Sequence, residues 1–143
     1  MQYDFGAYDL AGRLRAVVEV KRQTGTSADW AAKFRRNLMA HGNAPPGELF
    51  AIVAPDKIYV WRAGAALEAA PDTEIDATPI LAPYFEQASA KPDRIDATAF
   101  DLLVAWWLED VARHGKPLAD AALRRSGLPD ALAGGRIARE IAA

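Results

Sequence analysis

The sequence predicts an α/β fold in which a strand-rich first part is followed by a mostly helical C-terminal part. Residues 3–8 alternate and are rich in aromatic side chains, and residues 13–21 are rich in valine, as β-strands are. Residues 28–40 place apolar side chains on one face at helical spacing. The expected order is therefore β-β-α-β-β up to residue 62, followed mainly by helices.

Polar, glycine and proline residues indicate where the first elements begin and end. Asp9 and Gly12 suit a turn between the first two strands, because Asp accepts hydrogen bonds from nearby backbone N–H groups and Gly adopts positive φ. Ser27 is a favourable N-cap for the helix over 28–40, and the prolines at 45–46 forbid its continuation. The first two strands should therefore form a β-hairpin that leads into a capped helix.

The next two strands are expected over 48–54 and 57–62, with a tight turn between them. Residues 63–94 are rich in Ala, Pro and Asp and indicate a long connection with one short helix near 80–88.

Three helices are expected after this connection. Asp96 can cap an amphipathic helix over 97–113. A shorter helix should follow from Pro117 to about Arg125, and then a weak terminal helix. We expect a single domain over 1–143, because this length suits one domain with its own core.

Composition excludes several classes of function. The net charge is −2, so no overall basic field attracts nucleic acid, although a local basic patch remains compatible with it. There is no cysteine, which excludes disulfides and cysteine-ligated zinc and fits a reducing compartment. Neither a run of about 20 apolar residues nor a signal peptide is recognisable, so we expect a cytoplasmic protein without a membrane partner.

A carboxylate and an ammonium group end the second strand, at Glu19 and Lys21. Side chains alternate along a strand, so these two point the same way, while Val20 faces the core. Asp4 lies on the partner strand and can approach Glu19 across the hairpin. Two adjacent carboxylates repel unless a cation lies between them, and Mg²⁺ prefers oxygen ligands. Lys21 would then be placed to act on water or phosphate.

The stretch YDFGAYDLAGRLRAVVEVKR, residues 3–22, resembles the PD-(D/E)XK nuclease superfamily, and within it the nuclease domains of type I restriction enzymes and small standalone relatives. Asp4 matches the first acid of that pattern, Glu19 the second and Lys21 the lysine, while Tyr3 replaces the usual proline. The resemblance implies a restriction-endonuclease-like mixed β-sheet core flanked by helices, with ββαββ over 1–62 and a long connection and C-terminal helices over 63–143. It further implies DNA cleavage that depends on Mg²⁺ or Mn²⁺, with the Val20 carbonyl as a further ligand.

Other residues are weaker candidates for the same site. Gln23 can hold water or phosphate, although a loop amide bonded to local backbone is the more common situation. Arg22, Lys33, Arg35 and Arg36 can contact DNA phosphates, and a solvated helix face explains the last three at least as well.

Three functions are therefore open at this stage. The first is a metal-dependent DNA endonuclease in defence or repair, for which a homodimer is natural because cleaving both strands needs two sites. The second is an inactive nuclease-fold module that binds DNA or a partner protein. The third is a protein-interaction domain, suggested by Trp106, which is expected to be exposed on the helix over 97–113.

Overall fold

The structure is a computed structural model that describes residues 3–45, 48–114 and 120–140. A six-stranded sheet forms its centre. The strands are β1 (Phe5–Tyr8), β2 (Leu14–Val20), β3 (Leu49–Val53), β4 (Lys57–Trp61), β5 (Thr73–Asp76) and β6 (Arg136–Arg139). The helices in the described part of the chain are α1 (Ala28–Ala40), α2 (Thr78–Gln87), α3 (Ala97–His114), α4 (Ala121–Ser126) and α5 (Leu128–Leu132).

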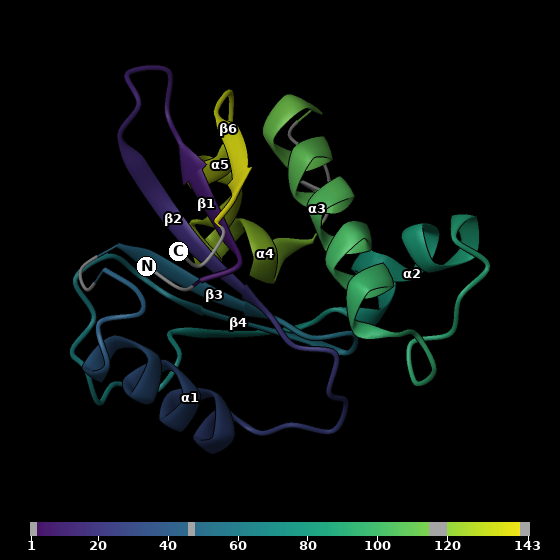
Figure 1. Ribbon diagram of the computed structural model, residues 1–143, viewed down its shortest axis with the longest axis horizontal. Coiled ribbons are helices and arrows are strands. Elements are labelled where there is room, and N and C mark those ends of the chain that lie inside the picture. The colour runs from purple at the N-terminus through teal and green to yellow at the C-terminus, as the bar shows by residue number, and fades with distance from the viewer. Residues whose placement is uncertain (1–2, 46–47, 115–119, 141–143) are drawn as a thin grey trace.

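The sheet is mixed, with the strand order β5-β4-β3-β2-β1-β6. Strands β2 and β3 are parallel, and every other neighbouring pair is antiparallel. Helix α1 is the crossover between β2 and β3 and lies on one side of the sheet, whereas α2 and α3 lie on the other (Figure 1). The predicted α/β class, with a mixed sheet flanked by helices, is confirmed.

Local hydrogen bonds explain why the first elements begin and end where they do. Asp9 Oδ1 accepts from the backbone N–H groups of Ala11 and Arg13, which closes the β1–β2 turn. Ser27 Oγ accepts from the backbone N–H of Trp30 and caps α1. The predicted limits of α1, residues 28–40, agree with the structure.

Two strands were not predicted from the sequence. The region 63–94 contains β5 next to β4 as well as the expected short helix α2. The weak terminal helix corresponds only to the short α5, and the chain then forms β6 along β1. Each of these strands has four residues, too few for a clear alternating pattern. Both are stabilised by pairing, β5 with the preceding strand β4 and β6 with the distant strand β1. The predicted start of a helix at Pro117 lies outside the described residues.

The two faces of β2 pack into different apolar clusters. Val18 and Val20 belong to the larger cluster, which includes Trp107 of α3. Val17 belongs to the smaller cluster, which includes Tyr59 and lies on the α1 side. Because Glu19 has the same parity as Val17, the alternation along β2 turns its carboxylate toward the α1 side. None of the helices that the structure describes combines the length and the apolar character required to cross a membrane.

Arg35 is a buried cation that links α1 to the segment after β4. Only 1% of its surface is exposed, and its guanidinium donates hydrogen bonds to the carbonyls of Ala65, Ala66 and Leu67. It also lies over the indole ring of Trp61, 5.3 Å from the ring centroid. Arg35 therefore acts as a structural cross-link, although its sequence position indicated an exposed residue.

We expect Arg35→Ala to lower the free energy of unfolding by about 2–4 kcal/mol, because the variant loses charge-assisted hydrogen bonds and the packing of the arginine stem. Urea unfolding followed by tryptophan fluorescence measures this change. Lys33→Ala is the matched control: its side chain is exposed on the same helix, so its effect should stay within about 0.5 kcal/mol. Equal stabilities of the two variants would contradict a structural role for Arg35.

Candidate functional site

Asp4 and Glu19 lie opposite each other on neighbouring strands. The antiparallel register pairs Phe5 with Val18, so the residue before β1 faces the residue after Val18. Asp4 is held in place by its side chain, because Asp4 Oδ2 accepts a hydrogen bond from the backbone N–H of Val20 at 2.7 Å. The hairpin thus brings together two carboxylates that are 15 positions apart in the chain.

Glu19 is a buried carboxyl group with an unsatisfied oxygen. Only 5% of the residue is exposed, and Glu19 Oε2 has no hydrogen-bond partner. Burial, followed by the nearby negative charge of Asp4, raises the pKa of Glu19 to about 9, and the Lys21 ammonium opposes this shift. A buried carboxyl with a free oxygen next to a second carboxylate is an unfavourable arrangement that a proton or a cation relieves.

Lys21 directly follows β2, and its positive charge acts on Glu19. Its Nζ lies over the ring of Phe34 of α1, 4.4 Å from the centroid, and the ring attracts the positive charge. Among the residues that the structure describes, no ion pair within 4.0 Å involves Asp4, Glu19 or Lys21. The side chains proposed from the sequence, Asp4, Glu19 and Lys21, therefore lie at one end of the β1–β2 hairpin. None of the ion pairs between described residues neutralises their charges.

The donor set suits a hard divalent cation. Carboxylate oxygens of Asp4 and Glu19 are the ligands that Mg²⁺ prefers, and Mg²⁺ commonly binds one or two carboxylates and keeps several waters. Glu19 Oε2 has the unused acceptor capacity that such an ion would fill. Over the described ranges, no group of three or more His, Cys, Asp or Glu side chains is close enough to hold an ion by itself. The main-chain carbonyl of Val20 and water would have to complete the ligand set.

One residue near the site was not found from the sequence. Asp101 lies on α3, is partly buried, and has a pKa raised by burial and then by the negative charge of Asp4, with Arg139 and Lys21 acting in the opposite direction. It lines a pocket of about 240 Å³ together with Lys21. In the sequence Asp101 is an ordinary polar residue of an amphipathic helix, and nothing local indicates that it returns to the hairpin.

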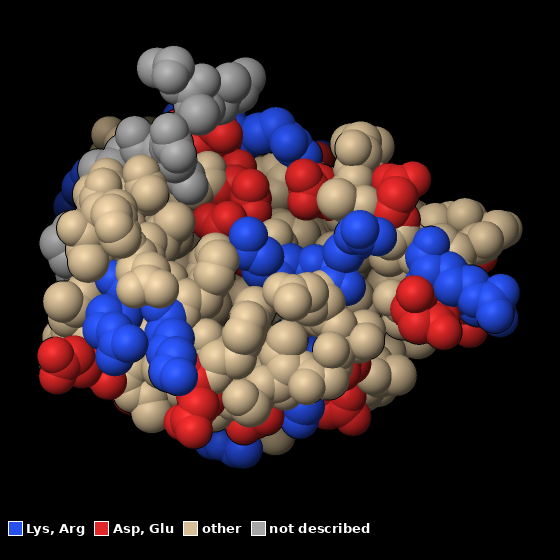
Figure 2. All heavy atoms as spheres, turned by 60° about the horizontal axis from the view of Figure 1, so that its bottom comes forward, with Lys and Arg blue, Asp and Glu red and all other residues tan. Residues whose placement is uncertain are grey.

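The weaker candidates take different positions. Arg22 and Gln23 are exposed and line the same pocket as Lys21, and Arg22 Nη1 donates to the carbonyl of Ile95 at 3.4 Å. Lys33 is exposed on α1, and Arg36 is partly buried there. On the face drawn in Figure 2, basic atoms form separate groups between acidic and uncharged atoms. This face therefore carries no continuous basic surface.

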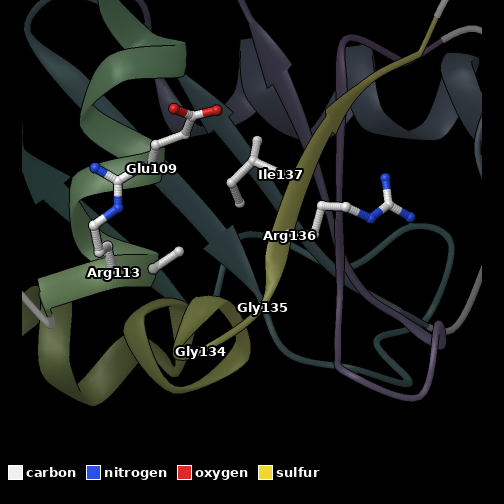
Figure 3. Close-up of a pocket in the computed structure, with 7 residues that line it drawn as sticks. Glu109, Arg113, Gly134, Gly135, Arg136 and Ile137 are labelled. Atoms are coloured by element: carbon white, nitrogen blue, oxygen red, sulfur yellow. The ribbon is translucent and has the colours of Figure 1, made fainter.

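A larger pocket, about 470 Å³, lies elsewhere, between α3 and the start of β6. Figure 3 shows Glu109 projecting from α3 with the Arg113 side chain running along the helix beside it, whereas Arg136 points away from α3. Arg136 instead places its guanidinium over the ring of Tyr8. The pocket is lined by one acidic and two basic residues, which favour no particular class of ligand, so the smaller pocket beside Lys21 is the better candidate.

Trp106, the other surface feature expected from the sequence, is 40% exposed. Its ring packs edge-to-face on Tyr84 of α2, with 4.7 Å between the centroids, and the Tyr84 hydroxyl donates to Asp110. These contacts give Trp106 a structural role in joining α2 to α3.

Comparisons with known proteins identify no relative of this chain: no family model matches it, and no curated protein or solved structure matches it significantly. The function must therefore be argued from the geometry of the site.

Proposed function

We propose that this chain is a metal-dependent nuclease with a restriction-endonuclease-like fold that hydrolyses phosphodiester bonds in DNA. The observation that supports this most directly is the buried, unsatisfied Glu19 carboxyl facing Asp4, with Lys21 alongside. These are the groups that a phosphodiesterase needs at one point: acidic ligands for a cation, and a positive side chain for the phosphate or the attacking water.

In this proposal, Asp4 and Glu19 would hold Mg²⁺ or Mn²⁺ with the Val20 carbonyl, and the bound ion would supply positive charge to a phosphoryl oxygen. Lys21 would face the same phosphate or hold the water that attacks it. The ring of Phe34 attracts the Lys21 ammonium, which lies 4.4 Å from the ring centroid, and so helps to hold it at the end of β2. Glu19 must lose its proton to bind a cation, so activity should increase with pH.

The substrate and the setting belong to the same proposal. Arg22 and Gln23 lie beside Lys21 and are exposed, and in this proposal they would contact the nucleic-acid backbone. Lys33 and Arg36 on α1 would add phosphate contacts. We further propose a homodimer, which would present two sites to the two DNA strands, and a cytoplasmic location.

The direct test incubates the purified protein with supercoiled plasmid and with single-stranded DNA in a series of divalent cations. We expect nicked and linear products with Mg²⁺ or Mn²⁺, and none with EDTA. If both DNA forms stay intact over the whole series of cations and from pH 6 to pH 9.5, nuclease activity is rejected. The pH range matters because the pKa of Glu19 is raised to about 9.

One observation favours a second candidate, a nuclease-fold module that binds DNA or a partner without cleaving. The pKa of Glu19, raised to about 9 by burial and by Asp4, favours a protonated carboxyl at neutral pH, and a proton relieves the repulsion with Asp4 as a cation would. Retarded DNA without any cleavage, unchanged by Lys21→Ala, would support this candidate over the first.

A further inference from the structure

We propose that Asp101 sets the divalent-cation affinity of the Asp4–Glu19 site from outside the ligand set, and that Arg139 is the countercharge that holds Asp101 while the ion is absent. This inference rests on the proposed function insofar as it assumes a cation at Asp4 and Glu19. It adds a residue from α3, a helix that follows the hairpin by more than 70 positions.

The first argument is the position of Asp101. Its helix covers the face of the sheet opposite α1, and Asp101 shares the pocket of about 240 Å³ with Lys21, Arg22 and Gln23. The negative charge of Asp4 contributes to raising the pKa of Asp101, and the Lys21 ammonium opposes this rise. Asp4 thus lies within electrostatic reach of two other carboxyl groups, Glu19 and Asp101.

The second argument is that Asp101 is not a ligand in this arrangement. The described residues hold no cluster of three acidic groups that could share an ion. A carboxylate at longer range still attracts a cation through a partly buried, weakly screened environment, and it can accept a hydrogen bond from a water bound to the ion. The buried and unpartnered Oε2 of Glu19 is an independent sign of acceptor capacity that a cation would fill.

The third argument concerns Arg139. Its Nη2 lies 3.5 Å from Asp101 Oδ2, and both side chains are partly exposed, at 47% and 26%. Such a long, exposed pair contributes little to stability, so it can be broken at small cost. β6 places Arg139 next to the site, because Arg139 pairs with Phe5 and the next residue, Glu140, donates its N–H to the Asp4 carbonyl. Arg139 and an incoming cation would therefore compete for the same negative charge.

The test is the dissociation constant for Mn²⁺, measured by titration calorimetry on the whole chain at one pH and ionic strength. We expect Asp101→Asn to raise the Kd about tenfold or more, as loss of an outer partner of a metal site does. Arg139→Gln should change the Kd in the opposite direction, and this effect should shrink when Asp101→Asn is already present. If Asp101 had only a structural role, Asp101→Asn and Arg139→Gln would not change the Kd for Mn²⁺ in opposite directions.

Glu109→Gln is the matched control. It removes the same charge from an exposed position of the same helix, eight residues and about 12 Å further along its axis, beyond the Debye length at physiological salt. Its Kd should stay within about twofold of the unsubstituted protein. Thermal unfolding of each variant shows whether it is folded.

The outcomes separate the two proposals. If the unsubstituted protein binds Mn²⁺ and folded Asp101→Asn binds it equally well, the role of Asp101 is rejected while nuclease activity can stand. If affinity depends on Asp101 but no DNA is cleaved, the inference holds and the nuclease proposal fails. If the unsubstituted protein binds no Mn²⁺, both are rejected.

Discussion

Lys21→Ala is expected to abolish cation-dependent DNA cleavage, with a loss of about 10²–10⁴-fold in kcat, the range that a positioned proton-transfer group contributes. The physical reason is the position of the ammonium: it lies at the end of β2, within electrostatic reach of Glu19 and Asp101, and is held by the Phe34 ring. Single-turnover cleavage of a labelled duplex measures the change, because it isolates the chemical step from product release.

Two controls accompany this variant. Lys91→Ala removes the same charge from an exposed residue that lines a different pocket from Lys21, and its rate should match the unsubstituted protein. The Mn²⁺ affinity of Lys21→Ala should not fall, because the variant removes a positive charge near the cation rather than a ligand. A Lys21→Ala protein that cleaves DNA at the original rate would contradict the proposed role of this lysine.

Glu19→Gln is expected to stabilise the cation-free protein at alkaline pH while abolishing cleavage. The folded state raises the pKa of Glu19 from 4.5 to about 9, so the folded protein retains a proton that the unfolded chain releases. The contribution of Glu19 to stability is therefore complete below pH 4.5 and is lost progressively up to about pH 9. Each pH unit within this window costs at most about 1.4 kcal/mol, so a loss of about 2–3 kcal/mol is expected between pH 5 and pH 7.

The measurement is a set of urea unfolding curves between pH 5 and pH 9 without divalent cation. Glu19→Gln should lack this part of the pH dependence, whereas Glu86→Gln, on an exposed position of α2, should keep the profile of the unsubstituted protein. Addition of Mn²⁺ at pH 8 should stabilise the unsubstituted protein and not Glu19→Gln, because a ligand that binds only the folded state raises stability. Superimposable profiles for Glu19→Gln and the unsubstituted protein would contradict the burial argument.

The parts of the fold that were predictable from the sequence depend on local signals. The β1–β2 turn, the cap at Ser27 and the limits of α1 follow from side chains that bond to nearby backbone, and these predictions are confirmed. The missed strands, β5 and β6, are short and depend on pairing with β4 and β1. Arg35 was assigned to the solvent because its partners, the carbonyls of residues 65–67, lie about 30 positions further along the chain.

The same distinction applies to the candidate site. Asp4, Glu19 and Lys21 could be proposed together because a hairpin converts sequence spacing into spatial neighbours. Asp101 could not, because its approach to Asp4 depends on how α3 packs on the sheet and on β6 closing beside β1. Only tertiary packing determines that position.

The most direct measurement of the central claim is a crystal structure of the protein grown with Mn²⁺, using anomalous scattering to locate the ion. We expect one strong anomalous peak bonded to a carboxylate oxygen of Asp4 and to Glu19 Oε2, at about 2.0–2.2 Å, the distance typical of small hard divalent cations. A fully ordered site with no peak between these carboxylates, or with Mn²⁺ bound only elsewhere, would contradict it.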